Sequence, residues 1–337
     1  MDSVVLTLTN SGDTTADYLC GFAHEQGIKV IRFNTDRPIS DLAIEFMAGR
    51  IVITICDNQI VPDNVSTVWM RRPTPLTSSA SGDAAASQFL LNEWAEALEG
   101  FLAFIPPDRW INHPTCNAIA SSKLEQISRA SSYGLHVPET LLTQDPSKAF
   151  DWWKKWSGAV IVKPLSSGYL ERMEGNDGLI YTNRVERGDI QNFSRVQECP
   201  TLFQRAIEKI LDVRVTVIDE VIHAVGLKCR DEAGKQIQDI RRDNMEGVQY
   251  VPVLMPPDVQ KKLLALIRSY SLRFSAIDFV IDRDGKWVFL EINPNGQWAW
   301  LDLVGATRIR DSFINAFRAD REKREHGEKI SSTTIPA

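Results

Sequence analysis

Several features that would narrow the function of this chain are missing from its sequence. Its five cysteines are scattered and show no CxxC spacing, which argues against a disulfide framework or a zinc site and favours a reducing cytoplasm. No apolar run approaches the ~20 residues of a membrane span, and no basic segment precedes the strand-like stretch Val4–Thr9. The net charge of −6 makes an extended nucleic-acid surface unexpected. We therefore expect a cytoplasmic protein with no nucleic-acid partner and no membrane partner.

The two common glycine-rich phosphate motifs are also absent. Strand-like Val4–Thr9, helical Thr15–Gln26 and strand-like Lys29–Phe33 predict a parallel α/β layer at the start of the chain. No GxGxxG motif accompanies this layer, so a dinucleotide site there is not expected. The Walker A pattern GxxxxGK[ST] is missing as well. A nucleotide would need a different kind of site.

A candidate metal site is present near the C-terminal end, in the stretch Phe289–Trp298 (FLEINPNGQW). Residues i and i+2 of a strand share a face, so Glu291 and Asn293 point the same way. Hard oxygen ligands on a rigid strand suit magnesium, particularly magnesium that also takes phosphate oxygens. A buried strand that ends in a polar turn is the alternative for these residues alone.

An upstream segment adds a third oxygen ligand. The apolar run Ala276–Ile281 and the turn-forming Arg283–Lys286 predict a β-hairpin. If Asp284-Gly285 is a two-residue turn, Asp278 lies opposite Glu291. Two carboxylates placed opposite each other repel, so a bound cation is the economical explanation. The other face of the hairpin is then apolar and consists of Ile277, Phe279, Ile281, Leu290 and Ile292.

A lysine at the end of a strand provides a candidate phosphate contact. Ala159–Lys163 (AVIVK) is strand-like, and the loop residues Ser166, Ser167 and Gly168 follow it. A lysine at the inner end of a buried strand is costly unless it meets an anion, and small residues after it allow backbone N–H groups to form an anion-binding concavity. Alternatively, the Lys163 side chain simply extends to water.

Arginines form a second set of candidate anion contacts. Arg214 follows Asp212 on a predicted hairpin, and Arg241-Arg242 lies in a polar loop, where surface salt bridges are the alternative. Arg71-Arg72 ends another strand and is either solvated or in contact with an anion or peptide. Side chains alternate between the two faces of a strand, and by this alternation Lys228 does not share a face with Arg214 unless the strand contains a bulge at Gly226.

A short predicted strand, Thr201–Arg205, stops at Ala206-Ile207-Glu208. Free backbone groups at such a point can bind an adenine edge, and the Glu208 carboxylate can accept hydrogen bonds from ribose hydroxyls.

The order of these elements resembles the ATP-grasp superfamily of carboxylate–amine/thiol ligases over roughly residues 110–315. The resemblance is strongest to the graspetide (microviridin-type) peptide ligases. It rests on Arg32–Asp36 (RFNTD), Trp69–Pro73 (WMRRP) and Phe289–Trp298 with Trp300. The family's usual Asp-Ile/Leu-Arg-Val is Asp212–Val215 (DVRV) here, and the loop after Lys163 has fewer glycines than many relatives.

The resemblance implies an α/β (α+β) ATP-grasp fold in three parts. These are an N-terminal pre-ATP-grasp α/β domain with a parallel sheet (1–112), a small central lid (113–205) and a C-terminal antiparallel-sheet domain (206–325). A disordered tail (326–337) is expected to follow them.

The resemblance also implies roles for residues. Lys123 and Lys163 would hold the phosphates of ATP, Gln204, Arg205, Ala206, Ile207 and Glu208 the adenosine, and Asp278, Glu291 and Asn293 a Mg²⁺ ion. The substrate would be a ribosomally made precursor peptide with a leader and an acidic core, and the enzyme a homodimer. Two alternatives remain: a RimK-like ligase that adds a free amino acid, and a non-catalytic module that binds ATP or a peptide.

Overall fold

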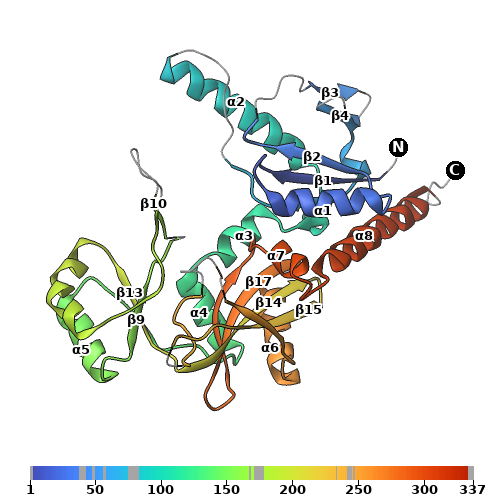
Figure 1. The fold of residues 1–337 in the computed structure, drawn as a ribbon. Coiled ribbons are helices and arrows are strands. Elements are labelled where there is room, and N and C mark those ends of the chain that lie inside the picture. Colours follow the sequence, from blue (N-terminus) through green and yellow to red (C-terminus); the bar gives the residue numbers. More distant parts are fainter. Residues whose placement is uncertain are drawn as a thin grey trace.

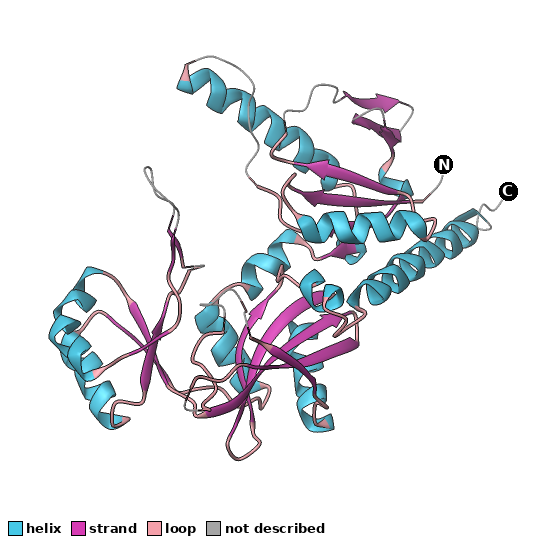
Figure 2. Ribbon diagram, in the orientation of Figure 1, coloured by secondary structure: helices cyan, strands magenta, loops and turns pink. Residues whose placement is uncertain are grey.

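The computed structural model describes residues 3–37, 43–47, 50–55, 58–74, 83–166, 168–170, 178–232, 234–240, 245 and 247–332. These residues form three lobes (Figure 1), each built on its own sheet. Helices and sheets alternate through all three lobes (Figure 2), which confirms the predicted mixed α/β class.

The first lobe is a parallel sheet of order β2-β1-β6-β7. Its central strand β1 is buried along its whole length, as is usual for a parallel strand covered on both faces. Helices α1 and α8 pack against one face, and helix α2 packs against the other through Phe101. The elements are β1 (Val4–Thr9), α1 (Thr14–Glu25), β2 (Val30–Asn34), β3 (Ala43–Met47), β4 (Arg50–Ile55), β5 (Asn58–Ile60), β6 (Val65–Met70), α2 (Ala84–Leu102) and β7 (Trp110–Ile111).

The second lobe is a small antiparallel sheet of order β12-β9-β13-β8. Helix α5 and a 3₁₀ segment, Arg187–Glu198, cover it and enclose a compact apolar core. Trp152, Trp153 and Trp156 pack against that core. The elements are β8 (Thr140–Thr143), α5 (Pro146–Lys155), β9 (Val160–Lys163), β10 (Tyr169–Leu170), β11 (Gly178–Leu179), β12 (Asn183–Arg184) and β13 (Thr201–Arg205).

The third lobe is a five-stranded antiparallel sheet of order β16-β15-β14-β17-β18 with an apolar core on each face. Helix α6 packs on one face, and helices α7 and α8 pack on the other. The elements are β14 (Lys209–Ile218), β15 (Val221–Lys228), β16 (Gln249–Pro252), α6 (Pro257–Ser269), β17 (Phe274–Asp282), β18 (Trp287–Asn293), α7 (Ala299–Leu303) and α8 (Ile309–Ser332).

Two helices predicted to begin the central lid pack elsewhere. α3 (Pro114–Ala120) and α4 (Lys123–Ser132) join the core of the third lobe through Ala120 and Ala130. The buried Gln126 side chain fixes this packing, since its Nε2 donates to the Ile292 carbonyl at 2.8 Å and its Oε1 accepts from the Ile292 amide at 2.8 Å. Both helices thus fall within the range predicted for the lid, 113–205, and pack on the third lobe.

The end of the chain also differs from the prediction. Helix α8 continues to Ser332, beyond residue 326 where the tail was predicted to begin, and residues 333–337 lie outside the described part. Within the described residues, no helix is both long enough and apolar enough to span a bilayer.

Candidate functional site

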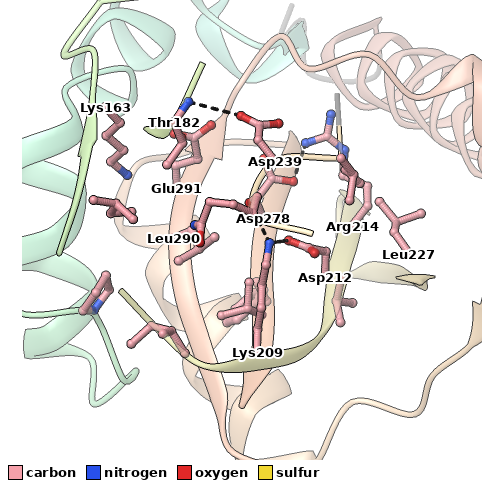
Figure 3. A pocket seen from close by; sticks show the side chains of 18 of the residues that line it. Lys163, Thr182, Lys209, Asp212, Arg214, Leu227, Asp239, Asp278, Leu290 and Glu291 are labelled. Carbon is pink, nitrogen blue, oxygen red and sulfur yellow. Dashed lines mark hydrogen bonds and ion pairs between the residues drawn. The ribbon is translucent and has the colours of Figure 1, made fainter. Parts of the chain in front are cut away.

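A cavity of about 230 Å³ separates the small sheet from the C-terminal sheet (Figure 3). One wall comes from the second lobe and its exit, and includes Ile161, Lys163, Gln204, Arg205 and Ile207. The facing wall comes from β14, β17 and β18, and includes Asp212, Arg214, Asp278, Glu291 and Asn293. Eight of the seventeen site residues predicted from the sequence therefore meet in one place.

The predicted pairing of Asp278 with Glu291 is confirmed, although the hairpin reaches it in a different way. The turn is a three-residue loop, Arg283–Gly285, closed by hydrogen bonds between Asp282 and Lys286, with Gly285 at φ 78°. This loop shifts the register by one residue near the turn. Leu290 is an extra residue in β18 that restores the expected register from Glu291 onward.

The bulge at Leu290 changes which side chains face the core. Leu290 was predicted to lie on the apolar face, but it lines the cavity. Phe289 takes the core position and is fully buried against Phe279. An alternating pattern cannot show such an inserted residue, because every side chain before it changes face.

Arg214 is the cation that accompanies Asp278. Its Nη1 donates to Asp278 Oδ1 at 2.7 Å, and its Nη2 donates to the Gln297 carbonyl at 3.3 Å. The Arg214 side chain is 14% exposed and that of Asp278 is 37% exposed. Arg214 thus partly relieves the repulsion between Asp278 and Glu291, so a bound metal ion is not needed to explain why the two carboxylates lie opposite each other.

The donor chemistry around Glu291 still fits magnesium. Asp278, Glu291 and Asn293 present two carboxylates and one amide oxygen to the same cavity. Among the described residues, Asn293 Oδ1 accepts one hydrogen bond, from the Asn295 amide at 3.2 Å, which leaves a lone pair for a metal ion. No cluster of three His, Cys, Asp or Glu side chains occurs among the described residues, so phosphate oxygens or water would have to complete the coordination.

A buried lysine–aspartate pair was missed by sequence reasoning. Lys209 Nζ donates to Asp212 Oδ1 at 2.6 Å, and Gln236 Nε2 donates to Oδ2 at 2.8 Å. Burial raises the pKa of Asp212, and the Lys209 ammonium opposes that rise. Strict alternation would place Lys209 and Asp212 on opposite faces of β14. Ile210 is an extra residue in this strand, so the two side chains lie on the same face. Other lining residues missed in the sequence are Thr182, Leu227 and Asp239.

Lys163 lines the cavity, whereas Lys123 supports the loop beside it. Lys123 Nζ donates to the carbonyls of Pro164 at 2.6 Å and Ser166 at 2.9 Å. Gly168 ends this loop at φ 74°, and a Cβ there would lie 2.7 Å from the Ile180 carbonyl oxygen. Ser166 is described, while Ser167 lies outside the described residues.

Only some residues of the predicted adenosine segment, 204–208, line the cavity. Gln204, Arg205 and Ile207 line the cavity. The Gln204 side chain is buried and donates to Thr140 Oγ1 at 2.9 Å, and the Ala206 amide donates to the Ala159 carbonyl at 2.8 Å. Glu208 does not line the cavity, because it is 62% exposed and paired with Arg283 at 3.0 Å.

Three further predicted residues either do not line the cavity or lie outside the described part of the chain. β14 and β15 pair without interruption from Asp212–Leu227 to Ile218–Val221, so no bulge turns Lys228 inward, and Leu227 lines the cavity instead. Arg241 and Arg242 lie outside the described residues. Their neighbour Asp239 accepts a hydrogen bond from the Thr182 amide at 3.3 Å, which links this loop to the small lobe.

The turn after β18 joins the C-terminal sheet to the N-terminal lobe. Arg71 is 1% exposed, and its guanidinium donates to the Asn295 carbonyl and, at 2.7 Å, to Gln297 Oε1. Its Nε lies 3.5 Å from the Asp13 carboxylate, and burial lowers the pKa of Arg71 to about 10. Arg71 is therefore neither solvated nor free for a substrate, whereas Arg72 is exposed at the same strand end.

Comparison with known proteins gives a consistent set of relatives. Residues 4–118 match the MvdD pre-ATP grasp domain family. Over 189 residues the chain is 25% identical to the alpha-aminoadipate–LysW ligase LysX of Sulfurisphaera tokodaii; the match covers 54% of this chain and spans only 62% of that relative.

Two solved structures match nearly the whole chain. Macrocyclase MdnC of Microcystis aeruginosa, bound to its precursor peptide MdnA, is 25% identical with a TM-score of 0.78, covering 94% of this chain and 99% of that one. A RiPP-associated ATP-grasp ligase of Chryseobacterium gregarium, in complex with ADP and a leader and core peptide, is 26% identical with a TM-score of 0.82, covering 94% and 97%. The predicted ATP-grasp fold is thereby confirmed. This chain therefore has the fold of the ATP-grasp superfamily and carries an MvdD-type pre-ATP-grasp domain at its N-terminal end.

Proposed function

We propose that this protein is an ATP-dependent macrocyclase that joins an Asp or Glu side chain of a ribosomally made precursor peptide to a Ser/Thr hydroxyl or a Lys amine of the same peptide. The observation that carries the proposal is the cavity in which Lys163 faces Asp278 and Glu291 across the gap between two sheets. The similarity to MdnC and to the Chryseobacterium ligase, both solved with precursor peptides, supports the choice of substrate.

The cavity walls suggest how ATP would be held. Gln204, Arg205 and Ile207 would contact the adenosine, and Lys163 the phosphates, while Lys123 keeps the Pro164–Ser166 loop in place. Asp278, Glu291 and Asn293 would hold Mg²⁺, which neutralises phosphate charge when bound. Lys123 thus acts on the loop and not directly on a phosphate.

The chemistry requires charge neutralisation more than a protein nucleophile. A carboxylate oxygen of the peptide attacks the γ-phosphorus of ATP, ADP leaves, and an acyl phosphate forms. The hydroxyl or amine then attacks the acyl carbon and loses its proton, and phosphate leaves with the former carboxylate oxygen. The peptide loses one water for each ring closed.

Arg214 is placed to stabilise the charge that develops in these steps. It is mostly buried beside the cavity, and its Nε has no acceptor among the described residues. An oxygen of the peptide carboxylate or of the acyl phosphate would accept a hydrogen bond from this Nε–H group. Arg241 and Arg242 would steer the acidic core of the peptide toward Arg214.

A RimK-like ligase that adds a free amino acid is the second candidate, because the curated relative is a ligase that joins α-aminoadipate to a partner named LysW. The two functions differ in product mass. Incubation of the protein with ATP, Mg²⁺ and acidic Ser/Thr/Lys-containing peptides, followed by mass spectrometry, should show a loss of ~18 Da per step by the ring-closing chemistry. A gain equal to an amino-acid residue would overturn macrocyclisation in favour of the second candidate.

We further propose that the enzyme is a cytoplasmic homodimer and that α2 contributes to the dimer interface. Only Phe101 is buried in this 19-residue helix, while Phe89 is 60% exposed and no charged residue occurs between Ala84 and Asn92. A helix face of this kind needs a partner. Phe89→Asp should convert a dimer to a monomer in light scattering, and an unchanged dimer mass would exclude this face.

A further inference from the structure

A second cavity, of about 340 Å³, lies at the edge of the N-terminal sheet farthest from the Asn295–Gln297 turn. Its floor is formed where the parallel strands begin, by Ser3, Val5 and Ser66, with Gly27, Ile28 and Lys29 beside them. Its wall is one side of α8, from Phe317 to Glu325. The described residues that line this hollow include none that line the cavity between the small and the C-terminal sheets, so the two cavities are separate.

The lining of this hollow is strongly basic although the whole chain is acidic. The described residues that line it include four cations, Lys29, Arg318, Arg321 and Arg324, and one carboxylate, Glu325. The three arginines are spaced i, i+3 and i+6, which places them along one side of α8. Arg318 Nη2 donates to the neutral Gln26 Oε1 at 3.1 Å, and Glu325 lies 3.7 Å from Arg321 Nε. Arg324 Nη1 donates to the Asp63 carbonyl at 3.4 Å. Among the described lining residues, the cations therefore outnumber the carboxylates by four to one.

The floor supplies a polar group as well. Ser3 Oγ is buried and has no hydrogen-bond partner among the described residues, whereas the neighbouring Ser66 Oγ donates to the Val4 carbonyl at 3.1 Å. A buried hydroxyl without a partner is uncommon in a folded protein. A ligand oxygen in the hollow would give the Ser3 hydroxyl an acceptor.

We propose that this hollow binds a small multivalent phosphate anion, either free pyrophosphate or the diphosphate of a larger molecule. Guanidinium groups match phosphate oxygens in pairs, and several phosphate oxygens can engage more than one arginine at once. The volume equals that of roughly ten waters, enough for two linked phosphates. Bound there, the anion would hold the C-terminal half of α8 to the start of β1.

The test uses the full-length protein in metal-chelating buffer with inorganic pyrophosphate as the probe. Titration calorimetry compares the wild type with Arg318→Gln/Arg321→Gln and with Arg308→Gln/Lys323→Gln, which removes the same charge outside the cavity. We expect about tenfold weaker binding for the first variant and an unchanged affinity for the second. No binding by the wild type, or equal loss in both variants, would overturn the proposal.

A variant that binds pyrophosphate more tightly provides a control against loss of binding through misfolding. Glu325→Gln removes the one carboxylate and should tighten pyrophosphate binding severalfold, a result that a damaged fold cannot produce. Hydrogen exchange should show protection at residues 3–5 and 317–325 on addition of pyrophosphate. Protection confined to the catalytic cavity, around residues 160–163 and 278–293, would contradict a separate site. ADP in place of pyrophosphate shows whether a nucleotide diphosphate is accepted.

Discussion

Strand β18 and the turn that follows it are neighbours in the chain but differ in how their polar atoms are satisfied. On the strand, Glu291 is half-buried and faces a cavity, and its partner Asp278 remains 37% exposed. In the turn, Gln297 Oε1 accepts hydrogen bonds from Arg71 at 2.7 Å and from Thr15 at 2.5 Å.

The difference separates a binding surface from a junction. Oxygen atoms left accessible at a cavity can take a ligand, whereas atoms already saturated by protein partners only hold the lobes together. Changes on the strand should therefore affect turnover, and changes in the turn should affect stability.

The largest effect is expected from Arg71→Ala. This change leaves the buried Asp13 carboxylate without its cation and removes the bonds to the turn. Breaking a buried ion pair from one side costs about 3–5 kcal/mol. Urea unfolding measures the loss. The control is Arg195→Ala, which removes a 74% exposed arginine of the second lobe and should change the unfolding free energy by no more than about 0.5 kcal/mol. Equal losses for both variants would remove the distinction between them.

Glu291→Ala should act in the opposite way. Loss of a charge-stabilising ligand slows turnover by ~10²-fold, equivalent to about 2.7 kcal/mol, while stability changes little. ADP release with a cognate peptide measures turnover, and Glu220→Ala, an exposed change on the β14–β15 turn paired with Arg268, is the control. Normal ADP release by Glu291→Ala would remove Glu291 from the metal site.

Gly296→Ala probes how tightly the turn is packed. A Cβ at Gly296 would lie 2.4 Å from the Cβ of Ala276, so neighbouring atoms must move. Overpacking of this kind costs about 1–3 kcal/mol in unfolding free energy. Gly100 lies in helix α2 with open space around it, and Gly100→Ala should instead stabilise by about 0.5–1 kcal/mol. A neutral Gly296→Ala would show that the turn is loosely packed.

The smallest effect concerns pH. Burial lowers the pKa of His223, whose Nε2 lies 2.8 Å from Ser312 Oγ. Because the folded pKa lies below the unfolded value of 6.5, the neutral ring's contribution is complete above pH 6.5 and is lost as the pH falls toward the folded pKa. The slope of the unfolding free energy against pH should stay under about 1.4 kcal/mol per pH unit, and it should be smaller in the His223→Gln variant. Identical slopes in urea unfolding would exclude His223 as the cause.

Much of the site was predictable because period two and strand pairing fix which side chains meet. The predicted pairing of Asp278 with Glu291 is correct, but the hairpin differs from the prediction in two ways. Its loop is one residue longer, and the bulge at Leu290 compensates for that extra residue. Lys209 escaped detection because the extra residue Ile210 reverses its face. Inserted residues depend on tertiary packing, and alternation alone does not reveal them.

The role of the turn was out of reach for a different reason. Asn295 and Gln297 are defined by Arg71, more than 200 positions earlier in the chain. Only the fold brings the end of β6 against the end of β18, so no local pattern could indicate that these residues form a junction. The resemblance to the peptide ligases already included Asn295 and Gln297, and their contacts with Arg71 show what these residues do in the fold.

The most direct test of the central claim follows oxygen atoms through the reaction. A precursor peptide carrying ¹⁸O in its Asp and Glu side-chain carboxylates is incubated with the protein, ATP and Mg²⁺, and the released phosphate is analysed by mass spectrometry. Activation through an acyl phosphate predicts one carboxylate-derived oxygen in the phosphate for each ring closed. Ring closure with phosphate that carries no label would contradict activation of the carboxylate by ATP.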